Sequence, residues 1–229
     1  MTALSIQSDG EAAAQAAAEL LALLVGEAQS RHDVAHVSLA GGNTPRRAYE
    51  LLGPRLDAPD RVDWWFGDER CVPADDAESN FRLVTESLLP GLPYGARVHR
   101  IEGELPPAEA ASAYDAELRR VIGGVVPVLD VAFLGLGEDG HTASLFPGDP
   151  SLDVRDRLAV PVVAVKPPPN RITLTLPVFQ TARAVVVLAT GVGKKDAVAR
   201  VLAGRDRATP ASLLGGASLT LIVDEDAAP

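Results

Sequence analysis

The amino-acid sequence predicts an α/β fold of three layers, in which an open, mainly parallel sheet lies between helices on both of its faces. Short apolar runs that end in glycine alternate with segments whose apolar residues recur at helical spacing. This pattern is typical of strands joined by crossover helices. Because no long linker, low-complexity tract or internal repeat interrupts the alternation, we expect a single domain over residues 1–229.

In the first part of the chain we expect a helix, a strand and a second helix. The helix covers about residues 11–28 and buries an apolar stripe at i, i+3 and i+4 spacing, formed by Leu20, Leu21, Leu24, Val25 and Ala28. The strand at 35–39 ends at a glycine pair. Thr44 as N-cap and Pro45 at the first helical position then predict a helix that stops at Gly53 and buries Ala48, Leu51 and Leu52.

The same alternation continues to the end of the chain. A strand at 62–67 leads into a polar turn at 68–78, after which Ser79 is placed to cap a helix. The Pro106-Pro107 pair opens another helix. Apolar runs predict later strands at about 129–134, 159–165, 172–176, 184–189 and 219–223, with a helix at 194–202.

Charge and composition limit the partners that we expect. The 31 acidic residues outnumber the 21 basic ones, and the resulting charge of −10 repels nucleic acid and anionic membranes. The apolar segment at 12–25 is too short to span a bilayer. Cys71 is the only cysteine, and a single cysteine fits a reducing cytoplasm. We interpret Cys71 as a small buried residue. The spacing of His32 and His36 at a strand does not predict a metal site.

Ligands of open α/β sheets bind outside the carboxyl ends of the strands. The loops to consider therefore begin at Gly41, Asp68, Gly135 and Gly191. In the first of them, Gly42, Asn43 and Thr44 precede a helix, where free N–H groups and the helix dipole favour an anion. A tight turn without a ligand is the alternative interpretation of this loop.

Three cationic side chains stand at or near these loops. Arg70 follows Asp68 and Glu69, a combination that can bind sugar hydroxyls through the acids and a phosphate through the guanidinium. A surface ion pair is the alternative. Arg171 follows a stiff proline segment, which is either a plain connector or a support that holds the arginine against an anion. Lys194 begins a helix, and since a helix N-terminus repels cations, its position indicates an anionic ligand.

The most informative loop carries a histidine. Its glycines at 135, 137 and 140 form a dinucleotide-binding pattern, but the prolines that follow exclude the long helix that this pattern requires. We therefore expect no nucleotide cofactor. His141 is suited to act as a general base near neutral pH, and Asp139 can fix its tautomer. A hydrogen-bonded loop histidine without a catalytic role is the alternative.

These motifs resemble those of the 6-phosphogluconolactonases, within the wider group that includes the glucosamine-6-phosphate deaminases. The matching stretches follow the family's order over nearly the whole chain, at 38–45, 65–73, 79–80, 134–148, 171–177 and 191–194. The run from Asp139 to Gly148 is the most specific. The resemblance implies a Rossmann-like fold of the deaminase and ribose-phosphate isomerase type. It also implies hydrolysis of 6-phospho-D-glucono-1,5-lactone to 6-phosphogluconate in the oxidative pentose phosphate pathway.

The resemblance further implies a role for each matching residue. His141 corresponds to the base that activates water, and Asp139 to the residue that orients it. Asp68 matches an acid at the sugar-facing end of the site. The remaining matches are phosphate ligands, with side chains from Arg70, Arg171 and Lys194 and backbone donors from Gly42, Asn43 and Thr44. We expect no metal and no cofactor, and a cytoplasmic monomer or weak homodimer.

Two other functions remain as alternatives. In the deaminases, a glutamate that works with the histidine occupies the position of Phe146, and phenylalanine cannot take that role. The Asp68-Glu69-Arg70 triplet also follows the lactonase pattern. The third possibility is a sensor that binds a sugar phosphate without catalysis. Such a protein would not need a base.

Overall fold

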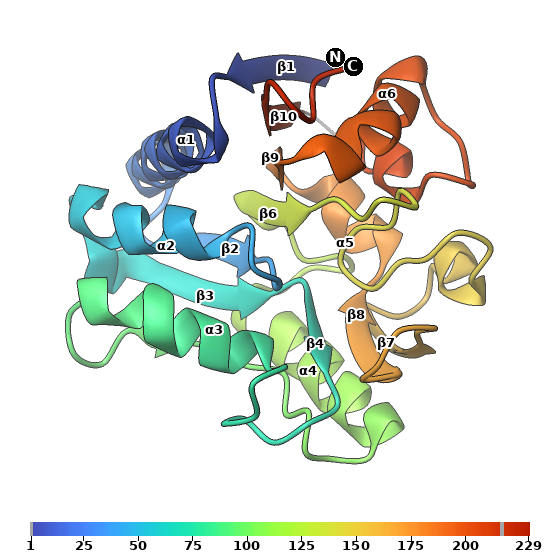
Figure 1. Ribbon diagram of the computed structural model, residues 1–229. Coiled ribbons are helices and arrows are strands. Elements are labelled where there is room, and N and C mark those ends of the chain that lie inside the picture. Colours follow the sequence, from blue (N-terminus) through green and yellow to red (C-terminus); the bar gives the residue numbers. More distant parts are fainter. Residues whose placement is uncertain (1, 216–217) are drawn as a thin grey trace.

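The computed structural model describes residues 2–215 and 218–229, and a seven-stranded parallel sheet lies at the centre of this part of the chain (Figure 1). The strand order is β1-β10-β9-β6-β2-β3-β5, and every neighbouring pair is parallel. The strands are β1 (Thr2–Gln7), β2 (Ala35–Leu39), β3 (Val62–Phe66), β5 (Arg97–Val98), β6 (Val131–Gly135), β9 (Ala184–Ala189) and β10 (Leu219–Asp224). The predicted α/β class with a mainly parallel sheet is confirmed.

Helices cover both faces of this sheet. On one face α1 packs against α2, and on the other lie α5 and α6 (Figure 1). The helices are α1 (Gly10–Arg31), α2 (Arg46–Leu52), α3 (Asn80–Ser87), α4 (Pro107–Val121), α5 (Leu176–Thr181) and α6 (Lys195–Ala203). No described helix has the length and apolar character needed to cross a membrane. One continuous hydrophobic core joins the helices to the strands.

Three strands form a separate antiparallel sheet, which the sequence did not predict. It has the order β4-β8-β7 and consists of β4 (Asp68–Arg70), β7 (Ala159–Val163) and β8 (Asn170–Leu174). The expectation of a turn from residue 68 onward was therefore wrong for the first three positions. Gly67 joins β3 to β4, and its backbone bonds to both sheets, with its N–H donating to Leu39 and its carbonyl accepting from Leu174.

Two details near the N-terminus also differ from the sequence prediction. Strand β1 was missed because its side chains are mostly exposed at the sheet edge and give no buried apolar run. In α1 the buried stripe is rich in alanine, which allows close packing against α2, whereas Leu20 and Leu24 are only half-buried. The buried residues of α1 are Ala13, Ala14, Ala17, Ala18, Leu21, Val25 and Ala28.

The helix caps were predicted in part. Ser79 caps α3 as expected, because its hydroxyl accepts the N–H of Arg82 at 3.2 Å. Helix α2, by contrast, begins one residue later than expected, with Pro45 as N-cap and no capping bond from Thr44. Tyr49 replaces Leu51 as a buried residue of α2, since its hydroxyl reaches the carbonyl of Ala40 at 2.7 Å.

Candidate active site

The carboxyl ends of four adjacent central strands surround a pocket of about 340 Å³. The loops after β2, β3, β6 and β9 all contribute to it, in agreement with the expectation that ligands of open α/β sheets bind at the carboxyl ends of the strands. Eight of the nine predicted site residues line this pocket, namely Gly42, Asn43, Thr44, Asp68, Arg70, His141, Arg171 and Lys194. The ninth, Asp139, contacts His141.

His141 and Asp139 form a close pair at this pocket. The Nδ1 atom of His141 lies 2.6 Å from Oδ1 of Asp139, and the same oxygen accepts the backbone N–H of His141 at 3.1 Å. The backbone carbonyl of His141 accepts the N–H of Gly137 at 2.8 Å, which closes the loop. Partial burial works to raise the pKa of Asp139, but the hydrogen bonds and charge of His141 outweigh it and lower the pKa. The arrangement leaves Nε2 of His141 available as a proton acceptor.

An aromatic ring occupies the position next to this pair. The ring centroids of His141 and Phe146 are 5.0 Å apart, with the planes tilted by 47°. The guanidinium of Arg171 lies 6.0 Å from the Phe146 centroid. A phenyl ring therefore lies beside the imidazole, and among the described residues Asp139 supplies the only carboxylate that is bonded to it.

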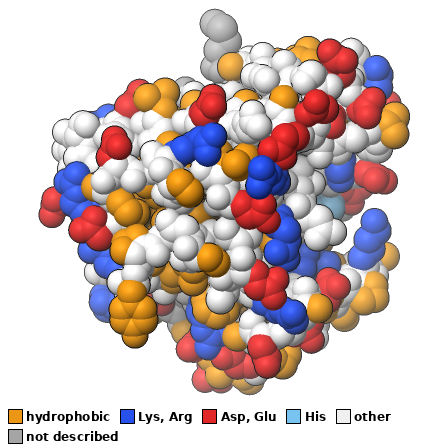
Figure 2. All heavy atoms as spheres, turned by 60° about the vertical axis from the view of Figure 1, so that its left-hand side comes forward, with side chains coloured by type: hydrophobic (Ala, Val, Ile, Leu, Met, Phe, Trp, Pro, Cys, Tyr) orange, Lys and Arg blue, Asp and Glu red, His pale blue; other side chains and the backbone are white. Residues whose placement is uncertain are grey.

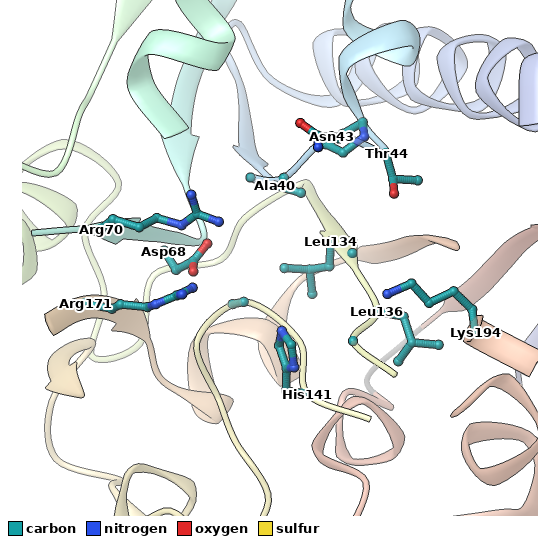
Figure 3. A pocket seen from close by; sticks show the side chains of 16 residues that line it. Ala40, Asn43, Thr44, Asp68, Arg70, Leu134, Leu136, His141, Arg171 and Lys194 are labelled. Atoms are coloured by element: carbon teal, nitrogen blue, oxygen red, sulfur yellow. The ribbon is translucent and has the colours of Figure 1, made fainter. Parts of the chain in front are cut away.

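Cationic side chains reach the pocket from two sides. Arg70 and Arg171 extend from one side and Lys194 points toward them from the other, with His141 below (Figure 3). On the face shown in Figure 2, acidic and basic side chains are intermixed, and basic side chains lie beside a hollow at the right of the view. This grouping of three cations contrasts with the negative charge of the whole chain and favours an anionic ligand.

The small antiparallel sheet brings the two arginines together. Arg70 in β4 is directly paired with Arg171 in β8. The side chain of Arg171 donates to the carbonyls of Pro168 and Lys166, at 3.1 and 3.4 Å, so the proline segment supports it. Burial, and then the nearby charge of Arg70, lower the pKa of Arg171. Two guanidinium groups this close together are best stabilised by a bound anion.

Asp68 lies between the two arginines and is held by buried neighbours (Figure 3). Its carboxylate accepts the hydroxyl of Ser144 at 2.5 Å and the amide of Asn80 at 3.1 Å. The same amide donates to the backbone carbonyl of Asp68 at 2.9 Å. Sequence reasoning did not assign these supporting roles to Ser144 and Asn80, because no local pattern indicates contacts over 76 and 12 positions.

Glu69 does not line the pocket, unlike its neighbours in the triplet. Its buried carboxylate accepts the backbone N–H groups of Arg70, Asn80 and Phe81 at 2.7 to 2.8 Å and the hydroxyl of Ser79 at 3.2 Å. It thus stabilises the N-terminus of α3, which the helix dipole favours. Glu69 therefore faces α3 and not the pocket, which contradicts the interpretation that it binds a sugar hydroxyl together with Asp68.

Replacing Glu69 with glutamine is expected to lower the free energy of unfolding by about 1–3 kcal/mol, because the new NH₂ group would face N–H donors. Burial raises the pKa of Glu69 to about 7, against the backbone hydrogen bonds from Asn80, Arg70 and Phe81. The folded state then binds this proton more tightly than the unfolded chain does. Stability from this group is therefore present at low pH and is lost as the pH rises through about 7.

Urea denaturation of the wild type and of Glu69→Gln at pH 5 and pH 8 measures both effects. The margin by which the wild type is more stable should shrink as the pH rises. A variant as stable as the wild type at pH 5, or a margin that grows with pH, would contradict this account of Glu69.

The other titratable candidates of the sequence do not join the site. Burial raises the pKa of the Cys71 thiol to about 11, with a smaller contribution from Glu69, so the thiol is a poor nucleophile. His32 precedes β2 and pairs with Asp130, and His36 lies near the start of β2 and pairs with Asp63. Both histidines are therefore at the end of β2 that is opposite to the pocket. No cluster of three or more His, Cys, Asp or Glu side chains within residues 2–215 and 218–229 is arranged to hold a metal ion.

Comparisons with known proteins point to one family. Residues 8–222 match the family model described as glucosamine-6-phosphate isomerases/6-phosphogluconolactonase. The chain is 40% identical to human 6-phosphogluconolactonase over 219 residues, which is 92% of this chain and 84% of the human protein. It is 38% identical to the Streptomyces coelicolor 6-phosphogluconolactonase, over 98% of this chain and 93% of that protein. The 45% identity with the rat 6-phosphogluconolactonase covers 65% of this chain and 59% of the rat protein.

Solved structures give the same result. The 6-phosphogluconolactonase of Trypanosoma brucei is 29% identical with a TM-score of 0.88, covering 99% of this chain and 97% of its own. A monomeric glucosamine-6-phosphate deaminase has a TM-score of 0.81 at 21% identity, over 98% of both chains. At that identity the likeness to the deaminase concerns the fold alone.

Proposed function

Because the chain belongs to the family of the glucosamine-6-phosphate isomerases and 6-phosphogluconolactonases, we propose that it hydrolyses 6-phospho-D-glucono-1,5-lactone to 6-phosphogluconate, as in the oxidative pentose phosphate pathway. The observation that supports this proposal most is the Asp139–His141 pair beside a pocket with three cationic side chains. A base for water and cations for a phosphate are the two requirements of this reaction.

In the proposed reaction His141 acts as the general base. Asp139 accepts a hydrogen bond from the Nδ1–H group of His141, which leaves Nε2 unprotonated. Nε2 then takes a proton from a water molecule while the water oxygen bonds to the lactone carbonyl carbon. The tetrahedral intermediate then collapses, and the bond from the carbonyl carbon to the ring oxygen breaks. The ring oxygen takes up the proton from His141 and becomes the hydroxyl of the open-chain acid. Asp139 stabilises the imidazolium in between.

The phosphate of the substrate is proposed to bind among the three cations. Arg70 and Arg171 approach it from one side and Lys194 from the other. The backbone N–H groups of the loop from Gly42 to Thr44, which lines the same pocket, add donors. Asp68, held between the arginines by Ser144 and Asn80, is then in place to accept a sugar hydroxyl.

The surroundings of His141 favour hydrolysis over deamination. A deaminase requires a second carboxylate at the ring-opening step, and the ring of Phe146 stands beside the imidazole instead, 5.0 Å from it. A phenyl ring cannot transfer a proton.

Two assays on the purified protein test this function. The first couples lactone hydrolysis to phosphogluconate dehydrogenase at mildly acid pH, where spontaneous opening of the lactone is slow. The second measures ammonia release from glucosamine 6-phosphate. We expect activity in the first assay alone. Activity in the second would indicate a deaminase, and binding of the sugar phosphate without activity in either would indicate a sensor.

A further inference from the structure

The loop that carries Asp139 and His141 is attached to the C-terminal part of the chain. Arg200, in the middle of α6, donates from Nη2 to the backbone carbonyl of Glu138 at 2.9 Å. Its Nε donates to the hydroxyl of Thr209 at 3.2 Å. One side chain therefore joins the loop after β6 to helix α6 and to the segment at 206–213.

The segment at 206–213 supports the same loop directly. The backbone N–H of Ala211 donates to the carbonyl of Gly140 at 3.0 Å. Thr209 is completely buried and fills the space next to Gly140, where a Cβ atom would lie 2.8 Å from its Cγ2. Gly140 also has a φ of +92°, which favours glycine. The residue immediately before His141 is thus fixed on two sides.

Helix α6 also carries a phosphate ligand of the proposed site. Lys194 is the N-cap of α6, six positions before Arg200. The side chain of Glu138 packs over the turn that presents this lysine, since a Cβ atom at Gly193 would lie 2.7 Å from its Oε1. The turn itself is anchored to β10, because the N–H of Gly191 donates to the carboxylate of Asp224 at 2.9 Å.

We propose that Arg200 is a positioning residue, which holds the loop of Asp139 and His141 at a fixed distance from Lys194. This inference rests on the proposed role of His141 as the base. Arg200 does not line the pocket and forms no hydrogen bond or ion pair with Asp139 or His141, and within the described residues its hydrogen-bond acceptors are Glu138 and Thr209. Its effect on the reaction is therefore one of geometry, because small displacements of a reacting group reduce the rate strongly.

Arg200→Met tests this proposal, because methionine keeps an unbranched apolar stem and removes both hydrogen bonds. We expect kcat for the phosphorylated lactone to fall by roughly tenfold, while KM changes by less than about threefold. The imidazole NMR signals of His141, assigned by their loss in His141→Ala, should shift or broaden. Those of His32, His36 and His99 should not, since these histidines contact Asp130, Asp63 and Glu117 instead.

Arg119→Met is the matched control. Like Arg200, Arg119 donates from Nε to one side chain, Asp115 at 2.6 Å, and from a terminal nitrogen to one backbone carbonyl, that of Val125 at 3.0 Å. It lies on α4, whose residues do not line the pocket. We expect unchanged kcat and unchanged His141 signals in this variant.

A folded Arg200→Met with kcat within twofold of the wild type and with unchanged His141 signals would overturn the proposal. If Arg200→Met does not fold, Arg200→Lys decides instead, because a single ammonium cannot reach both acceptors in the geometry of the guanidinium. A loss of about threefold in kcat with shifted His141 signals would support the proposal. Wild-type values of both would contradict it.

The same measurements separate this proposal from the proposed function. If His141→Ala hydrolyses the lactone at the wild-type rate, the assignment of the base fails and the role of Arg200 fails with it. If His141→Ala is inactive while Arg200→Met has wild-type activity and signals, the base assignment stands and only the positioning role is wrong.

Discussion

Replacing His141 with alanine is expected to lower kcat for the phosphorylated lactone by roughly 10²–10⁴-fold, the loss typical of a positioned general base. The KM should change little, because the proposed phosphate ligands lie on other loops, at Arg70, Arg171 and Lys194. The coupled assay measures both constants after subtraction of spontaneous lactone opening. A variant with the wild-type kcat would show that His141 is not the base.

Two further variants make this result specific. Asp139→Asn keeps the size of the side chain but removes its charge, and we expect a loss of kcat that is smaller than that of His141→Ala, because the base is kept but the imidazolium is no longer stabilised. His32→Ala removes a histidine that pairs with Asp130 away from the pocket, so its activity should stay unchanged. Equal losses in all three variants would indicate a general effect on folding.

The pH profile gives an independent check of the pair. Partial burial alone would raise the pKa of Asp139, but the hydrogen bonds and charge of His141 act more strongly, so the net effect is a lowered pKa. The carboxylate therefore stays ionised throughout the mildly acid and neutral range. Any loss of activity between pH 7 and pH 5 must then come from another group, and Asp139→Asn should not remove it.

The sequence predicted the elements that have a strong local signal. Strands β2 and β9 were predicted at their observed bounds, because β9 is an uninterrupted apolar run and β2 is a short, mostly apolar segment that ends at a glycine pair. Strand β1 was missed because it is exposed at the sheet edge. Strand β4 has only three polar residues, and it is a strand because it pairs with β8 more than 100 positions later. The spacing of apolar residues within a short segment cannot reveal a pairing with so distant a strand.

The candidate site, like the fold, could be predicted from the sequence only in part. Its loops could be located from the sequence, because the carboxyl ends of parallel strands lie on one edge of the sheet. The pairing of Arg70 with Arg171 could not, since it depends on the small antiparallel sheet. The burial of Glu69 against α3 could not be predicted either, because Glu69 and Asp68 are neighbours in the sequence and only the folded structure shows that they face different surroundings. Adjacent carboxylates in a strand point to opposite faces, and here one faces the pocket and the other a helix.

Removing Lys194 is expected to change the substrate preference of the enzyme. A hydrogen bond between charged groups contributes about 1.5–3 kcal/mol, so Lys194→Ala should lower kcat/KM for the phosphorylated lactone by about 10–100-fold. For unphosphorylated gluconolactone, which lacks the anion, we expect a change of less than about threefold. Arg70→Ala should show the same selective loss, because its guanidinium lines the pocket on the opposite side.

Lys195→Ala is the matched control for this prediction. Lys195 is the next residue along the chain, has the same charge and is exposed, but it does not line the pocket. If phosphate recognition came only from the general field of the protein, the two lysine variants would lose equal activity, and high salt would weaken both equally. A loss in Lys194→Ala alone, and with the phosphorylated lactone alone, requires a direct contact with the phosphate. Equal losses of Lys194→Ala on both lactones would mean that Lys194 serves the ring or the fold instead.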